Sequence, residues 1–160
     1  FALITYASCY LKCHYPEVFV CSLLNAQPMG FYSPRALVQD AQKHAVRFLP
    51  IDIQKSQYDY TLESKAVRVG FRALHGLKEA HIQKIIEARE RNGRFQTLGD
   101  LVHRTSTPKN TLMRLAAAGA LRSLGLTVRE ALWKIQALVL DQQSLFFAKT
   151  SDRIRRFSGA

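Results

Sequence analysis

The chain has few cysteines, and it has no long apolar run. Three cysteines among 160 residues form no paired framework, so reduced thiols typical of a cytoplasmic protein are expected, buried as small hydrophobes. Cys9 and Cys13 share a helical face beside His14, but no fourth ligand and no CxxC pair accompanies them, so no metal site is predicted. No apolar run reaches the length of about 18 residues that a transmembrane helix needs, which argues against a membrane partner.

Clustered carboxylates are lacking as well. Catalysis by paired divalent cations needs such a cluster, whereas Asp52, Asp59, Glu63 and Asp100 lie on separate predicted elements. The serines and histidines form no nucleophilic set, and neither a P-loop nor a GxGxxG loop is present. The chain alone is therefore predicted to be non-catalytic, with no catalytic residue, no metal ligand and no cofactor of its own.

Positive charge is concentrated in the second part of the chain. Residues 1–64 carry five Lys or Arg and five Asp or Glu, whereas residues 65–160 carry 18 and 7, so the formal net charge of +11 belongs to the second part. This asymmetry is typical of a domain that meets a polyanion. The alternative is a solvated basic surface without a partner.

The neutral part is predicted to begin with helices. Residues 2–24 should form two helices, because Pro16 disfavours helical backbone in the residue before it. Residues 1–7 are apolar on both faces, so they are expected to be buried against something larger. Ser33, which precedes a proline, predicts the N-cap of a third helix that runs to about His44.

A small β element is predicted next. Residues 46–51 are extended in character, and residues 58–62 and 66–71 are rich in strand-forming side chains. Residues 63–65 between the last two predict a hairpin turn. The predicted boundary between the neutral and the basic parts follows residue 64.

The basic part is predicted to be helical. Gly93 should end a first helix, Thr97 should cap a second, Pro108 should begin a third and Thr127 should cap a fourth. The pattern fails from residue 142, and residues 142–160 are predicted to be a linker or a frayed basic tail. The fold class predicted for the whole chain is mainly α, with one small β hairpin.

A glycine turn opens the first of these helices. The sequence Leu-His-Gly-Leu-Lys-Glu-Ala at residues 74–80, followed by apolar residues at helical spacing, resembles a helix-hairpin-helix motif. Such a motif aims backbone N–H groups and the positive end of a helix dipole at a nucleic-acid phosphate, without reading bases. Lys78 stands where the usual motif has a second glycine, and could itself contact phosphate. The alternative is an ordinary turn between two helices.

A second copy of the turn is predicted at residues 115–121, around Gly119, and two such hairpins can pack as a pair and grip a DNA backbone. The DNA-binding residues predicted from both turns and their flanking cations are Gly76, Leu77, Lys78, Lys84, Arg114, Gly119, Ala120 and Arg122. Contacts of this kind predict binding that depends steeply on salt and little on sequence.

Several segments resemble one polymerase family. Residues 23–34, Leu-Leu-Asn-Ala-Gln-Pro-Met-Gly-Phe-Tyr-Ser-Pro, together with residues 11–16, resemble the bacterial C-family DNA polymerases, the alpha-type replicative subunits. The Gln-Pro-Met-Gly-Phe-Tyr-Ser-Pro stretch is similar to the error-prone branch of that family. Residues 49–52, 56–63 and 115–121 resemble further segments of the family, and the similarity runs to about residue 140.

The resemblance implies that this chain supplies some parts of a polymerase and that the catalytic part lies outside it. It implies that residues 1–64 are the C-terminal part of the polymerase fingers, that residues 65–141 are a tandem helix-hairpin-helix domain, and that residues 142–160 follow as a linker. It also implies template-directed DNA synthesis and translesion synthesis during DNA repair, in the cytoplasm, with Mg²⁺ in a palm that this chain does not contain. The implied partners are DNA, the rest of the polymerase chain, the sliding clamp and mutagenesis accessory proteins.

Two other hypotheses remain open from the residues. The chain could come from the housekeeping replicative subunit of the same family. It could also be a freestanding, non-enzymatic helix-hairpin-helix module, although an apolar segment at residues 1–7 is unusual for the start of an independent domain. A basic protein-interaction domain without a DNA role is a weaker third choice.

Overall fold

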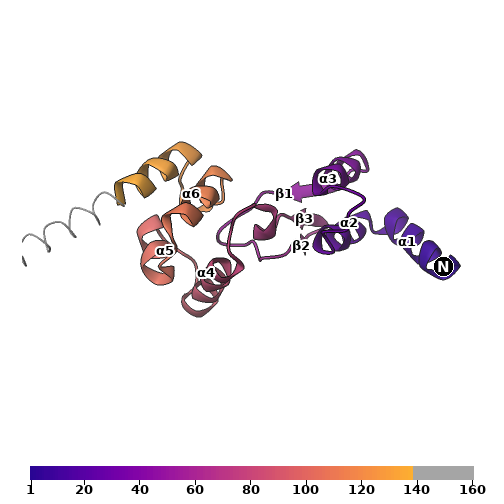
Figure 1. Cartoon of the computed structure of the whole chain (residues 1–160), viewed down its shortest axis with the longest axis horizontal. Helices are drawn as coiled ribbons and strands as arrows, with labels where there is room; N and C mark the ends of the chain where they lie inside the picture. Colours follow the sequence, from indigo (N-terminus) through magenta and orange to yellow (C-terminus); the bar gives the residue numbers. More distant parts are fainter. Residues whose placement is uncertain (139–160) are drawn as a thin grey trace, which may run out of the picture.

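The computed structural model describes residues 1–138, and in it the chain extends from helix α1 at one end to helices α5 and α6 at the other (Figure 1). The neutral part begins with α1 (Ala2–His14), α2 (Pro16–Asn25) and α3 (Pro34–Lys43). Pro16 and Pro34 each occupy the start of a helix, where their missing N–H costs nothing. The Ser33 hydroxyl accepts a hydrogen bond from the Ala36 N–H at 3.2 Å, so the predicted cap of the third helix is confirmed.

A three-stranded sheet follows, formed by β1 (Arg47–Leu49), β2 (Thr61–Glu63) and β3 (Ala66–Arg68) in the order β1-β3-β2. Strands β2 and β3 form the predicted antiparallel hairpin, whose two turn residues both have positive φ. Strand β1 pairs with β3 in parallel. This last pairing was not predicted, because parallel strands need a long connection and leave no local turn signal.

The basic part contains η1 (Phe71–Ala73), α4 (Glu79–Asn92), α5 (Leu98–Thr105), α6 (Lys109–Ala117) and η2 (Arg122–Leu124), and residues 128–138 are also helical. The predicted caps are present. Thr97 Oγ1 accepts from the Asp100 N–H at 3.1 Å, and the Thr127 N–H donates to the Glu130 carboxylate at 2.9 Å. The predicted fold class, mainly α with a small β element, is confirmed. The predicted linker at residues 142–160 lies outside the described residues.

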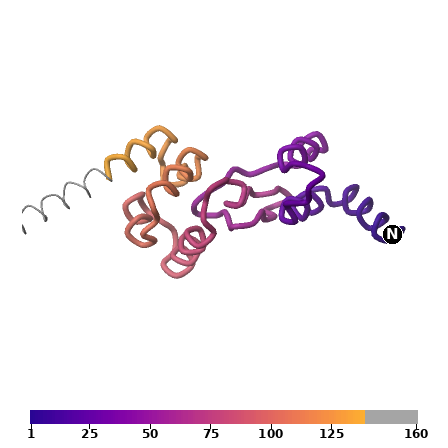
Figure 2. Tube along the Cα trace, viewed as in Figure 1, coloured from indigo at the N-terminus to yellow at the C-terminus, as the bar shows by residue number. Residues whose placement is uncertain are grey.

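Buried side chains form two clusters. The first, in the neutral part, comprises Val20, Cys21, Leu24, Ala41, Val46, Tyr60 and Val67. The second, among the hairpins, includes Ile51, Ile53, Phe71, Ile82, Ile85, Leu101, Leu112, Leu115 and Leu121. Each cluster takes side chains from both sides of position 64, so the chain crosses between the two clusters more than once (Figure 2). The partly buried Val69, just after β3, packs against both clusters. The predicted division of the chain into domains stays a prediction.

Helix α1 differs from its prediction. Within the described residues none of its side chains is buried, and Phe1, Leu3 and Ile4 are among the most exposed apolar side chains. The expected burial of residues 1–7 therefore does not occur within this chain, because α1 packs mainly on α2 and extends beyond it (Figure 1). Cys21 of α2 is buried as expected, but Cys9 and Cys13 of α1 are exposed, which corrects the prediction for these two thiols.

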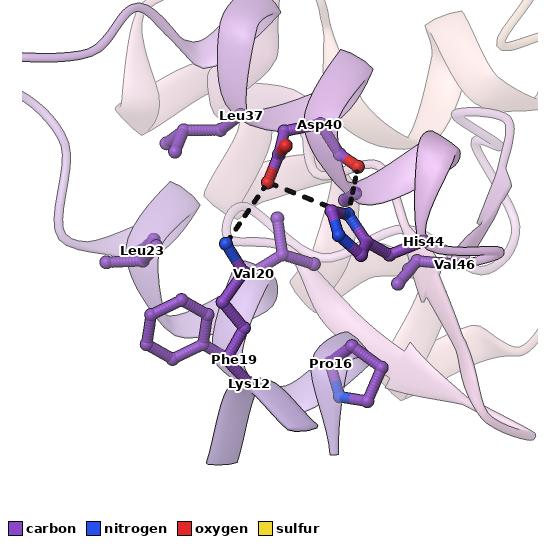
Figure 3. A pocket seen from close by; sticks show the side chains of 10 residues that line it. Lys12, Pro16, Phe19, Val20, Leu23, Leu37, Asp40, His44 and Val46 are labelled. Atoms are coloured by element: carbon purple, nitrogen blue, oxygen red, sulfur yellow. Dashed lines mark hydrogen bonds and ion pairs between the residues drawn. The ribbon is translucent and has the colours of Figure 1, made fainter. Parts of the chain in front are cut away.

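A salt-bridge cluster connects α1 to α3. Lys12 Nζ lies 3.6 Å from the Asp40 carboxylate, and His44 Nδ1 lies 3.8 Å from the same carboxylate (Figure 3). These groups border a pocket that is lined by Phe19, Leu23 and other apolar side chains (Figure 3). All three side chains are about half exposed, so this cluster contributes little to stability.

Candidate nucleic-acid interface

The first glycine turn is open to solvent. Gly76 has a φ of 78°, in the left-handed region that glycine adopts without strain. It lies between η1 and α4, and both Gly76 and Lys78 are exposed, whereas Leu77 is half-buried against the second hydrophobic cluster. Lys78 is the N-cap of α4, and no side chain among the described residues caps that helix. The positive end of the α4 dipole therefore faces solvent beside a lysine.

An arginine from the other hairpin covers this turn. Arg114 belongs to α6, and its Nη1 donates a hydrogen bond to the His75 carbonyl oxygen at 2.8 Å. A Cβ atom added at Gly76 would lie 2.8 Å from Arg114 Cζ and 3.0 Å from both of its terminal nitrogens. No real Cβ tolerates such a contact, so only glycine at position 76 leaves room for the guanidinium in this place.

A second link holds α6 against the start of α4. His81 Nδ1, in the first turn of α4, lies 3.2 Å from Thr111 Oγ1 of α6. Thr111 is buried and precedes Arg114 by three residues, so both side chains project from one side of α6. The helices behind the turn are fixed by Ile82 and Leu115, which are both fully buried. The contacts of His75 and His81 with α6 were not predicted, because their partners on α6 lie 39 and 30 residues away in the sequence.

The second glycine turn ends a helix. Gly119 has a φ of 73°, its N–H donates to the Ala116 carbonyl at 2.9 Å, and the Ala120 N–H donates to the Leu115 carbonyl at 3.0 Å. This pair of bonds is the Schellman arrangement that ends α6. The Ala120 carbonyl accepts from the Ile53 N–H at 2.9 Å, so both backbone polar groups of this fully buried residue are used inside the protein.

The predicted contact residues thus fall into two groups. Gly76, Leu77, Lys78 and Arg114 come together at the first turn, and Gly119, Ala120 and Arg122 come together at the second. Arg122 is exposed, and its Nε would lie 3.2 Å from a Cβ added at Gly119. Lys84 is exposed in the second turn of α4, apart from both groups.

Several arginines of the basic part are committed to internal bonds. Their partners are carbonyl or carboxylate groups of the same chain, and they are Arg68, Arg72, Arg89 and Arg104. Arg72 donates to the carbonyls of Asn25 and Gln27 at 2.8 and 2.9 Å, and it pairs with the Asp59 carboxylate. It therefore ties the neutral part to the segment that leads into the first turn. Burial lowers the pKa of the Arg89 guanidinium below its ordinary value. The charge available to a polyanion is smaller than the net charge suggests.

The acidic residues of the described part of the chain do not gather into a site for magnesium. Among residues 1–138 no three His, Cys, Asp or Glu side chains gather where they could hold a metal ion. Glu63 is paired with Arg68, Asp59 with Arg72, and Asp100 with Arg104. These residues therefore do not fit a centre that holds two metal ions. No helix in this same part of the chain has the length and apolar character to cross a membrane.

Comparisons with known proteins identify relatives of this chain. A family model described as a helix-hairpin-helix motif matches residues 45–131, which begins before the predicted boundary at residue 64. An error-prone DNA polymerase of Bdellovibrio bacteriovorus is 48% identical over 157 residues, covering 96% of this chain and 15% of the relative. Error-prone DNA polymerase 2 of Agrobacterium fabrum is 47% identical over 160 residues, with the same two shares.

An error-prone DNA polymerase of Sinorhizobium medicae is 40% identical over 183 aligned residues, covering all of this chain and 16% of the relative. The chain thus spans about 15% of the length of the curated relatives that it matches. The predicted resemblance to error-prone DNA polymerases is confirmed by these relatives. Because the motif model matches more than half of the chain, and does so over both glycine turns, the chain belongs to the helix-hairpin-helix family.

Proposed function

We propose that this chain is the DNA-holding segment of an error-prone DNA polymerase. One observation carries the proposal. The exposed Gly76 turn, at the positive end of α4, lies within the matched helix-hairpin-helix region of a chain that is 48% identical to part of such a polymerase. Backbone N–H groups and lysine at a helix start are suited to phosphate oxygens of any sequence.

The whole enzyme would carry out template-directed DNA synthesis, including synthesis across lesions during DNA repair in the cytoplasm. Its catalytic carboxylates and the Mg²⁺ that they hold would lie outside the described residues, because Asp59, Glu63 and Asp100 are each paired with an arginine and no three acids gather there. The sliding clamp and mutagenesis accessory proteins are proposed partners of the whole enzyme. The exposed apolar side chains of α1 would pack against the rest of the polymerase.

DNA binding by the 160-residue chain tests the first half of the proposal. Fluorescence anisotropy of a labelled duplex of mixed sequence would be measured over about 50 to 200 mM salt. We expect affinity that falls steeply with salt and is the same for unrelated sequences. An anisotropy that stays flat at low salt would overturn the proposed DNA-binding role.

A chimaera tests the second half. The matching segment of the Bdellovibrio bacteriovorus polymerase would be replaced by this chain, and primer extension on damaged and undamaged templates would be measured. We expect extension on both templates at rates close to those of the parent enzyme. A folded chimaera that binds DNA but extends neither primer would contradict the polymerase assignment and favour a non-enzymatic DNA-binding module.

A further inference from the structure

The two hairpins share one arginine. Arg114 belongs to the helix of the second hairpin, yet its guanidinium lies over the turn of the first, 39 residues away in the sequence. On one side the His75 carbonyl accepts from Nη1 at 2.8 Å, and on the other Gly76, which has no side chain, leaves space for Cζ. A long surface side chain normally loses rotamer freedom when it binds a ligand, and the hydrogen bond to His75 already restricts the freedom of this one.

The remaining donors of Arg114 lie at the turn that leads into α4. Among residues 1–138 no carboxylate lies within ion-pair distance of Arg114, and the side chain is exposed. A guanidinium presents its N–H donors in a planar fork, so one edge can bond a carbonyl while another bonds a phosphate oxygen. Lys78 and the uncapped first turn of α4 supply further positive potential at the same place.

We propose that the DNA phosphate at the first turn is bound jointly by both hairpins, with Arg114 as a ligand that the His75 carbonyl positions and for which Gly76 leaves room. The proposal rests on the proposed DNA-binding function and adds the partner residue of that site. It also gives Gly76 a second role beyond its φ of 78°, since any side chain there would displace the arginine. Arg122, by contrast, covers only the turn of its own hairpin.

The salt dependence of binding tests this role, using the full chain and the labelled duplex. Arg114→Gln keeps a donor for the His75 carbonyl but removes the charge, and Arg114→Lys keeps the charge but loses the fork. If Arg114 binds a phosphate, Arg114→Gln should weaken binding about tenfold and lower the slope of log affinity against log salt by about 0.9. Arg114→Lys should restore the slope but only part of the affinity.

The matched control is Arg35→Gln, which removes the same charge from an exposed arginine of α3 in the neutral part. It should leave the slope unchanged. A purely structural Arg114 would lower the melting temperature without moving the slope. Unchanged slope and affinity in Arg114→Gln, beside a wild-type chain that binds with steep salt dependence, would overturn the inference alone. A wild-type chain that does not bind would overturn the proposed function instead.

A double-mutant cycle tests the coupling between Gly76 and Arg114. Gly76→Ala and Arg114→Gln should each weaken binding, and the double variant should bind within about threefold of the weaker single variant. Effects that multiply would show that the two residues act independently and would contradict a shared site. Thermal melts of all variants separate loss of the ligand from loss of the fold.

Discussion

The two glycine turns share a positive φ and a nearby arginine, but they lie at opposite ends of their helices. Gly76 precedes α4, so its turn meets the positive end of a helix dipole, and it is exposed. Gly119 follows α6, so its turn meets the negative end, and it is buried. A phosphate is favoured at the first position and disfavoured at the second. The same residue type therefore serves ligand access in one hairpin and helix termination in the other.

The two turns also have different roles, because the second is structural and the first is the one that we expect to bind DNA. The second turn holds α6 in place, through the bond from Ile53 to Ala120 and the Schellman bonds, and α6 in turn presents Arg114 to the first turn. The second hairpin thus supports the first. At the second turn we expect the exposed Arg122 side chain to meet DNA, since the backbone groups of Ala120 are both bonded inside the protein.

The largest contrast is expected from charge reversal. Lys78→Glu should weaken duplex binding by about thirtyfold or more, because it places a negative charge where the α4 dipole and the lysine favour phosphate. Arg122→Glu should weaken binding only a few-fold. Anisotropy at fixed salt measures both, with Lys43→Glu in α3 as a control that should bind like the wild type. Equal losses at Lys78 and Arg122 would break the comparison between the turns.

A smaller contrast is expected from the glycines themselves. Both alanine substitutions cost about 1–2 kcal/mol of stability, because each forces a left-handed backbone on a residue with a Cβ. Gly76→Ala should in addition weaken DNA binding about tenfold by displacing Arg114. Gly119→Ala should leave the affinity of the folded protein unchanged. Denaturant unfolding and anisotropy on the same samples give both quantities, and a loss of affinity in Gly119→Ala alone would reverse the assignment.

The smallest effect that we expect is on the stability, at acid pH, of the helical segment that follows the second turn (residues 128–138). The Thr127 N–H and hydroxyl bond the Glu130 carboxylate and hold its pKa below the ordinary value of 4.5. The unfolded chain therefore binds this proton more readily, and the stabilisation is complete above pH 4.5 and lost as the pH falls through the lowered pKa.

Melting temperatures measured from neutral pH to about pH 3 should fall less for Glu130→Gln than for the wild type, since the amide cannot titrate. Arg129→Gln is a control that removes an exposed charge from the same helical segment and keeps the capping carboxylate. Identical dependence of melting temperature on pH in the wild type and in Glu130→Gln would show that this carboxylate does not stabilise the folded chain.

Much of the local structure could be predicted from the sequence. Prolines at residues 16 and 34, the cap at Thr97 and the strand pattern around residues 63–65 each act within a few residues, so their outcomes followed from local rules. The two glycine turns were found for the same reason. Their spacing gave no sign that one would be exposed and the other buried.

What could not be predicted depends on contacts between distant residues. The parallel pairing of β1 with β3, the bond from Ile53 to Ala120 and the reach of Arg114 to His75 leave no mark in local periodicity. The same holds for Arg72 and the other internally bonded arginines, which look like exposed cations in a basic sequence. Apolar character predicted a buried α1, but burial needs a partner surface that this chain does not supply.

Backbone amide spectra during a DNA titration test the central claim most directly. In ¹⁵N-labelled chain, the ¹H–¹⁵N signals of Gly76 and of the first turn of α4 should move on addition of duplex DNA, while those of Gly119 and Ala120 stay in place. Inorganic phosphate at matched ionic strength serves as the control for nonspecific salt effects. Shifts confined to Gly119 and Ala120, or absent from Gly76 at DNA concentrations that saturate the anisotropy signal, would contradict the account.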